Sequence, residues 1–149
     1  MAIDLAAERW ESLKAGTIGA LEFTIPCIFA TIINETVLQH FLQVQHVALP
    51  IGADLWMSLG AAVGCGFLFG ITYRYARRTD TNPFLQQGVV LAFGLTRAAG
   101  AIAPGIHWLS WGISTAEGLI GYGIAAVGLD WALRQGWVQP PSEQSNPGN

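Results

Sequence analysis

Long apolar runs alternate with short polar segments along the chain, and their spacing predicts membrane-spanning helices. We expect four spans, over residues 17–33, 55–73, 84–103 and 110–133. Each run is about as long as the 20 residues that a helix needs to cross the hydrocarbon core of a bilayer. The predicted fold class is therefore all-α, an integral membrane four-helix bundle with its spans in residues 16–137.

Residues 1–15 have apolar side chains on one helical face only, which is typical of a helix that lies on a membrane surface. Trp10 suits the headgroup layer, while Glu8 and Glu11 point the other way. We expect a separate amphipathic interfacial helix here. At the other end of the chain, residues 138–149 are rich in Pro, Ser, Gln and Asn, and they predict a disordered tail.

Residues 34–54 are too polar for a clean span, although Leu38, Phe41 and Leu42 share one helical face. Two interpretations stay open. The segment is either a second interfacial helix on the non-cytoplasmic side, or residues 34–49 extend the first span.

The positive charges follow the positive-inside rule. Six of the seven Lys and Arg residues fall in segments that four crossings would bring to one side: Arg9, Lys14, Arg74, Arg77, Arg78 and Arg134. This distribution predicts a multi-pass membrane protein with both termini in the cytoplasm.

Composition agrees with membrane insertion and argues against nucleic-acid binding. Of the 149 residues, 52% are hydrophobic and only 11% are charged, whereas about 25% are charged in soluble domains. The net charge is -3, and no basic patch interleaved with aromatic residues occurs. We expect membrane lipid, and no nucleic acid, as a partner.

Three ionisable residues lie inside predicted spans: Glu22, Arg97 and Glu117. Because charges inside a membrane are costly, they usually face the bundle interior and find a partner. Arg97 and Glu117 are expected at similar depth on consecutive antiparallel helices, so we predict a pair between them. The pair either fixes helix register or lines an ion or proton path. Glu22 is expected near the cytoplasmic surface, within reach of Arg74 or Arg77.

Four residues on the predicted non-cytoplasmic side are candidate ligands of a metal or pigment: Glu35, His40, His46 and His107. Their spacing matches no metal motif, since His40 and His46 lie about 240° apart around a helix. Ordinary interfacial histidines are the alternative interpretation. We expect no metal centre and leave the cofactor open.

Two small-xxx-small patterns, Gly60-xxx-Gly64 and Gly66-xxx-Gly70, predict faces where another helix approaches closely. The chain has no GxSxG or HExxH motif, and no serine has a placed base. We therefore expect no catalytic residues and no enzymatic activity.

The stretch from Tyr73 to Gly100 combines an Arg-rich loop, a turn at Asp80–Pro83 and a helix that contains Gly88-Val-Val, Ala-Phe-Gly and Arg97. In these features it resembles small multi-span membrane proteins of cyanobacteria and chloroplasts. The resemblance implies a thylakoid or plasma-membrane location and an accessory role related to photosynthesis.

Three functions fit these patterns. The first is a non-enzymatic accessory or assembly protein that docks to a larger membrane complex. The second is an oligomeric carrier or channel for a small solute or ion, with Arg97 and Glu117 in the path. The third is a pigment- or metal-binding membrane protein that uses the histidines.

Overall fold

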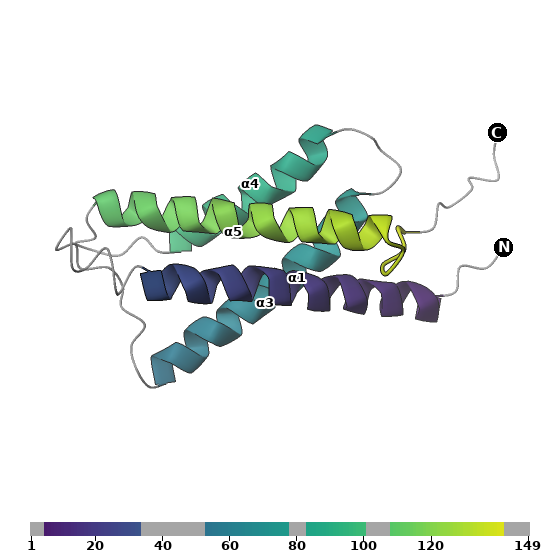
Figure 1. Cartoon of the computed structure of the whole chain (residues 1–149), viewed down its shortest axis with the longest axis horizontal. Coiled ribbons are helices and arrows are strands. Elements are labelled where there is room, and N and C mark those ends of the chain that lie inside the picture. The colour runs from purple at the N-terminus through teal and green to yellow at the C-terminus, as the bar shows by residue number, and fades with distance from the viewer. Residues whose placement is uncertain (1–4, 34–52, 78–82, 101–107, 142–149) are drawn as a thin grey trace.

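The computed structural model of the chain describes residues 5–33, 53–77, 83–100 and 108–141. Its regular secondary structure in these ranges is entirely helical, which confirms the all-α prediction there: α1 (Leu5–Ile33), α3 (Ala53–Ala76), α4 (Pro83–Gly100) and α5 (Trp108–Arg134). Successive helices run in alternating directions (Figure 1). Helices α1 and α5 lie side by side and antiparallel, and α3 and α4 cross them obliquely (Figure 1).

Three helices are long and apolar enough to cross a membrane, by length and composition. They cover Leu5–Ile33, Trp56–Ala76 and Trp111–Arg134. The described part of α4 is not among them, because its 18 residues include two glutamines, a threonine and Arg97. The predicted count of four spans is thus supported for three helices.

The separate surface helix predicted over residues 1–15 is wrong for the described residues. Helix α1 runs without a break from Leu5 to Ile33, so the expected boundary after residue 15 falls inside it. The buried residues Ala15 and Gly16 lie where α1 crosses α3. Packing across this boundary holds the two predicted segments in one straight helix.

Each helix contributes one aromatic ring to the centre of the bundle: Phe23, Phe69, Phe93 and Tyr122. The rings of Phe23 and Tyr122 stack at 4.0 Å between centroids, with 14° between their planes. Phe69 lies 4.9 Å from Tyr122 and 5.4 Å from Phe93, centroid to centroid. These contacts join all four helices in one core.

The outer surface of α1 is aliphatic and exposed. Leu21, Ile25, Phe29 and Ile32 follow one helical stripe, and each exposes at least half of its side chain. Soluble monomers rarely expose so large a contiguous apolar patch. Small and aromatic residues inside, with large aliphatic residues outside, are typical of helices that pack in lipid.

Helices α1 and α3 approach so closely that no side chain fits between them at Gly19, Gly66 and Gly70. A Cβ atom on Gly66 would lie 2.7 Å from the carbonyl oxygen of Gly19 and 2.9 Å from the Cα atom of Ala20. A Cβ atom on Gly70 would overlap the carbonyl group of Ala15. The Gly66-xxx-Gly70 pattern therefore serves an intramolecular contact.

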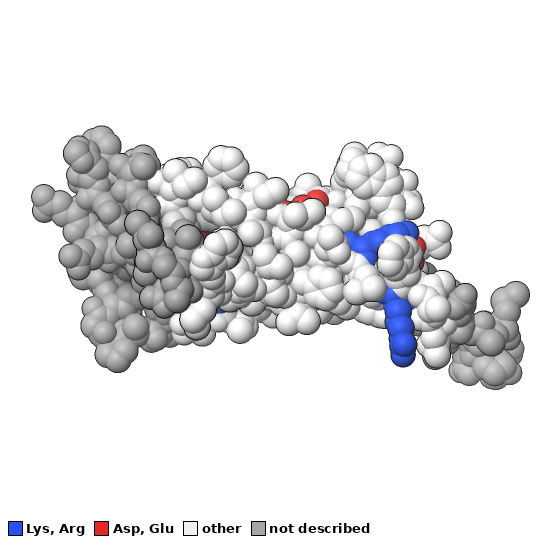
Figure 2. Space-filling view, turned by 90° about the horizontal axis from the view of Figure 1, so that it is seen from below, with Lys and Arg blue, Asp and Glu red and all other residues white. Residues whose placement is uncertain are grey.

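Five cations gather at one end of the bundle, where α1 begins and where α3 and α5 end: Arg9, Lys14, Arg74, Arg77 and Arg134. Figure 2 shows blue side chains at this end, while most of the visible described surface is white. The helix directions thus bring together the cations that were predicted to share one side. Arg78 lies outside the described residues.

Helix α5 ends in a tight turn that returns the chain to the bundle. Gly136 adopts a positive φ of 74°, and the amides of Trp137 and Gly136 donate to the carbonyls of Ala132 and Leu133, as in a Schellman motif. Val138 is then completely buried. The prediction of a disordered tail is therefore wrong for residues 138–141, and residues 142–149 lie outside the described chain.

Candidate functional site

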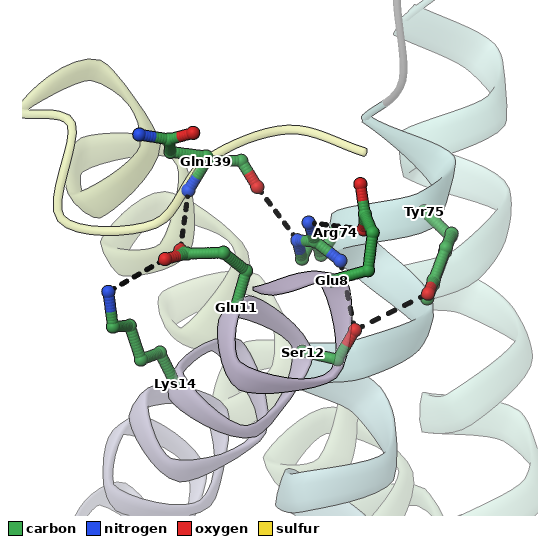
Figure 3. A network of polar contacts seen from close by, with 7 residues as sticks. All are labelled: Glu8, Glu11, Ser12, Lys14, Arg74, Tyr75 and Gln139. Atoms are coloured by element: carbon green, nitrogen blue, oxygen red, sulfur yellow. Dashed lines mark hydrogen bonds and ion pairs between the residues drawn. The ribbon is translucent and has the colours of Figure 1, made fainter. Parts of the chain in front are cut away.

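The cationic end is organised around the buried guanidinium of Arg74, which is 1% exposed (Figure 3). Nη2 of Arg74 pairs with Oε2 of Glu8 at 2.9 Å, and Nη1 donates to Oγ of Ser12 at 2.9 Å. Nε donates to the carbonyl oxygen of Gln139 at 2.7 Å. One side chain of α3 thereby holds the start of α1 and the segment after α5.

A second carboxylate completes this polar cluster (Figure 3). Glu11 accepts a hydrogen bond from the amide of Gln139 at 2.9 Å and pairs with Nζ of Lys14 at 2.7 Å. Because its charged groups already bind one another, we interpret the cluster as a structural clamp between three chain segments. Sequence reasoning missed it, since Glu8 and Gln139 were assigned to a surface helix and a disordered tail.

The expected contact of Arg74 or Arg77 with Glu22 is wrong. Arg74 pairs with Glu8, and Nε of Arg77 pairs with Oδ1 of Asp130 at 2.9 Å. Since α1 already begins at Leu5, Glu22 lies about 21 Å further along the helix axis than Glu8. The carboxyl group of Glu22 is therefore far deeper in the bundle than the sequence suggested.

Glu22 instead rests on α5, at Gly128. A Cβ atom on Gly128 would overlap the Glu22 carboxyl group, so a larger residue there would force this carboxyl group to move. Oε2 of Glu22 is buried and has no hydrogen-bond partner in the described chain. A buried carboxyl oxygen without a partner is costly, and such groups are candidates for a functional role.

A groove opens beside this carboxyl group, with a volume of about 500 Å³. We call it the α1/α5 groove. The side chains of Ile120, Ile124 and Val127 give it aliphatic walls, and Gly123 and Gly128 expose backbone. Glu22 is the one charged residue among those that line it.

Arg97 lies in the last turn of α4 and packs against α5. Its Cζ atom is 5.3 Å from the centre of the Phe23 ring, and its Cδ atom would lie 3.6 Å from a Cβ atom on Gly118. Gly118 directly follows Glu117 in the chain. The structure thus brings Arg97 to the turn of α5 that carries Glu117. The ion pair itself stays a prediction.

The first half of α3 carries a second candidate site, which we call the open α3 face: Trp56, Met57, Gly60, Val63 and Gly64. A Cβ atom on Gly60 or Gly64 would meet nothing within 4 Å in the described chain. The side chains of Trp56 and Met57 are 75% and 72% exposed. This half of α3 diverges from α1 beyond their crossing (Figure 1).

The candidate ligands Glu35, His40, His46 and His107 all lie outside the described residues. Within the described ranges, no group of three or more His, Cys, Asp or Glu residues is placed to hold a metal ion. Metal or pigment binding by these four residues therefore remains a prediction from the sequence.

Comparison with family models, curated proteins and solved structures found no match. The resemblance of residues 73–100 to cyanobacterial and chloroplast proteins remains a prediction from sequence. The function is argued below from the two candidate sites, the open α3 face and the α1/α5 groove.

Proposed function

We propose that this protein is a non-enzymatic integral membrane accessory protein that docks to a larger membrane complex through the open α3 face. The observation that carries the proposal is the space over Gly60 and Gly64, which no atom of the described residues fills. Glycine contributes little to packing against lipid, but it lets the backbone of another helix approach closely.

Helix α3 already makes a contact of this kind within the bundle. Its second half uses Gly66 and Gly70, with the same four-residue spacing, to receive Ala15 and Gly19 of α1. We infer that the first half receives a helix of similar chemistry, a transmembrane helix of the partner with small residues four apart. The exposed rings and chains of Trp56, Met57 and Val63 would flank that helix.

The proposal includes a topology. Four crossings, with α4 as the third, would place both termini and the cationic end in the cytoplasm, in agreement with the positive-inside rule. The up-and-down order of the helices supports this arrangement (Figure 1). An assignment to a photosynthetic membrane rests on the sequence resemblance of residues 73–100 alone.

Site-specific crosslinking in the native membrane tests the docking. A photo-reactive residue in place of Ala61, which is exposed and adjoins Gly60 and Gly64 on α3, should form an adduct with a different membrane protein. Gly64→Leu should reduce the yield of this adduct by about tenfold, because the leucine side chain fills the space that the partner backbone occupies.

Gly112→Leu is the matched control. Gly112 is an exposed glycine on α5 with open space over it in the described chain, so the same substitution there should leave the adduct unchanged. An adduct between two copies of the chain would indicate self-association and would contradict docking to a different protein. An unchanged adduct in Gly64→Leu would show that the open α3 face is not the docking site.

A further inference from the structure

The α1/α5 groove combines one carboxyl group with aliphatic walls on the outer surface of the bundle, where Ile120, Ile124 and Val127 are exposed. Glu22 lies about 25 Å from Leu5 and about 16 Å from Ile33 along α1. At this depth the groove lies within the apolar part of a candidate span. A lipid headgroup would not reach the carboxyl group, whereas a compact molecule dissolved in the membrane would.

The charges of the described chain leave the Glu22 carboxyl group uncompensated. On α3, Arg74 pairs with Glu8 and Arg77 pairs with Asp130 of α5. On α4, the guanidinium of Arg97 lies over the Phe23 ring. On α5, Tyr122 stacks on Phe23. Glu117 lies about 17 Å from Gly128 along the axis of α5.

An ionised carboxylate in such a place needs a counter-ion, because burial of an unpaired charge is costly. A proton or a bound cation removes that cost. A metal cation fits poorly, since Ca²⁺ and similar ions need several oxygen ligands and Glu22 is the one carboxylate among the lining residues. An organic cation with apolar substituents matches both the charge and the aliphatic walls.

We propose that the α1/α5 groove binds a hydrophobic organic monocation, with the Glu22 carboxylate as its counter-ion, in exchange for a proton. The volume of about 500 Å³ lies in the range of small-molecule sites, about 300–1,000 Å³. The apolar groups of the cation contact Ile120, Ile124 and Val127. The proton that leaves Glu22 passes to bulk water, so the net charge of the site is unchanged. This inference is independent of the docking proposed above.

Calorimetric titration of the full-length protein in detergent with tetraphenylphosphonium tests the proposal. We expect saturable binding at one site. In buffers of different ionisation enthalpy, the heats should report release of about one proton for each cation bound. Glu22→Gln keeps the shape of the side chain but removes the charge, and it should weaken binding by about tenfold or more.

Two glycine variants distinguish the groove from general adsorption to the apolar surface. Gly123 lines the groove, and no atom of the described ranges lies over it. Gly123→Leu should therefore fill the groove and weaken binding by about tenfold with Glu22 intact. Gly112→Leu adds the same side chain to α5 at a glycine that is not among the lining residues, and it should bind as the wild type does.

A measurement on the wild-type protein avoids any folding defect of the variants. Dicyclohexylcarbodiimide, which reacts with carboxyl groups in apolar surroundings, should label Glu22, and tetraphenylphosphonium should protect it. Mass spectrometry of the labelled peptide reads the result. Absence of saturable binding, binding without proton release, equal binding by Glu22→Gln or Gly123→Leu, or labelling without protection would each overturn the proposal.

Discussion

Replacement of Gly70 by leucine should separate α1 from α3 and disrupt the bundle. Even a Cβ atom at this position would overlap the backbone of Ala15, and backbone cannot move aside as the end of a flexible side chain can. We expect a loss of about 3 kcal/mol or more in the free energy of unfolding, at the upper end of the usual cost of overpacking.

The measurement is SDS-driven unfolding of the purified protein, together with near-ultraviolet circular dichroism. The near-ultraviolet signal reports aromatic rings in fixed surroundings, and the rings of Phe23, Phe69 and Tyr122 contact one another only while the helices are packed. It should fall in Gly70→Leu while the helix content in the far ultraviolet is kept.

Gly64→Leu is the control for this prediction, since it makes the same substitution on the same helix. The open space over Gly64 in the described chain should accommodate leucine, and leucine has a higher helix propensity than glycine. Its unfolding free energy should match or exceed that of the wild type. Equal losses in the two variants would contradict the assignment of the two glycine patterns to different faces.

Glu8→Gln should destabilise the cationic end strongly. The variant leaves the guanidinium of Arg74, which is 1% exposed, without its counter-ion. Loss of one partner of a buried pair costs about 3–5 kcal/mol. Because the Glu8 side chain is 20% exposed, we expect a loss at the lower end of this range, about 3 kcal/mol. SDS-driven unfolding measures this loss too.

Lys14→Gln provides the comparison, because it breaks an ion pair at the same end of the bundle. The Lys14 side chain is 38% exposed, so its pair with Glu11 should contribute less than about 1 kcal/mol. Addition of Arg74→Met to Glu8→Gln should restore part of the stability, since the double variant buries no unpaired charge. Losses of the same size in Glu8→Gln and Lys14→Gln would argue against a buried clamp.

The clamp also explains why the two ends of the chain were mispredicted. Residues 1–15 were interpreted as a surface helix because their apolar side chains share one helical face, and residues 138–149 as a disordered tail because they are rich in Pro, Ser, Gln and Asn. In the structure, Glu8, Ser12 and Gln139 are the partners of Arg74. Local composition does not distinguish polar residues that bind a buried cation from polar residues that face water, because the cation belongs to a distant segment of the chain.

Local properties of the sequence were sufficient for the helical class, for three apolar helices of spanning length and for the gathering of cations at one end. Hydropathy, helix length and charge depend on residues that are neighbours in the sequence, so they can be predicted without knowledge of the tertiary contacts. The glycine spacing likewise predicted close helix contacts, although it did not distinguish Gly60-xxx-Gly64 from Gly66-xxx-Gly70.

Only the tertiary structure decided which glycine pair is internal, where Arg74 finds its partners and which helix Glu22 meets. Each of these depends on the crossing angle and the axial offset of two helices, which are set by the packing of the whole bundle. Because α1 is one continuous helix, Glu22 lies far from the cationic end, and its carboxyl group packs against Gly128 of α5. No local pattern in the sequence contains that juxtaposition, because it joins residues about a hundred positions apart through the packing of the helices.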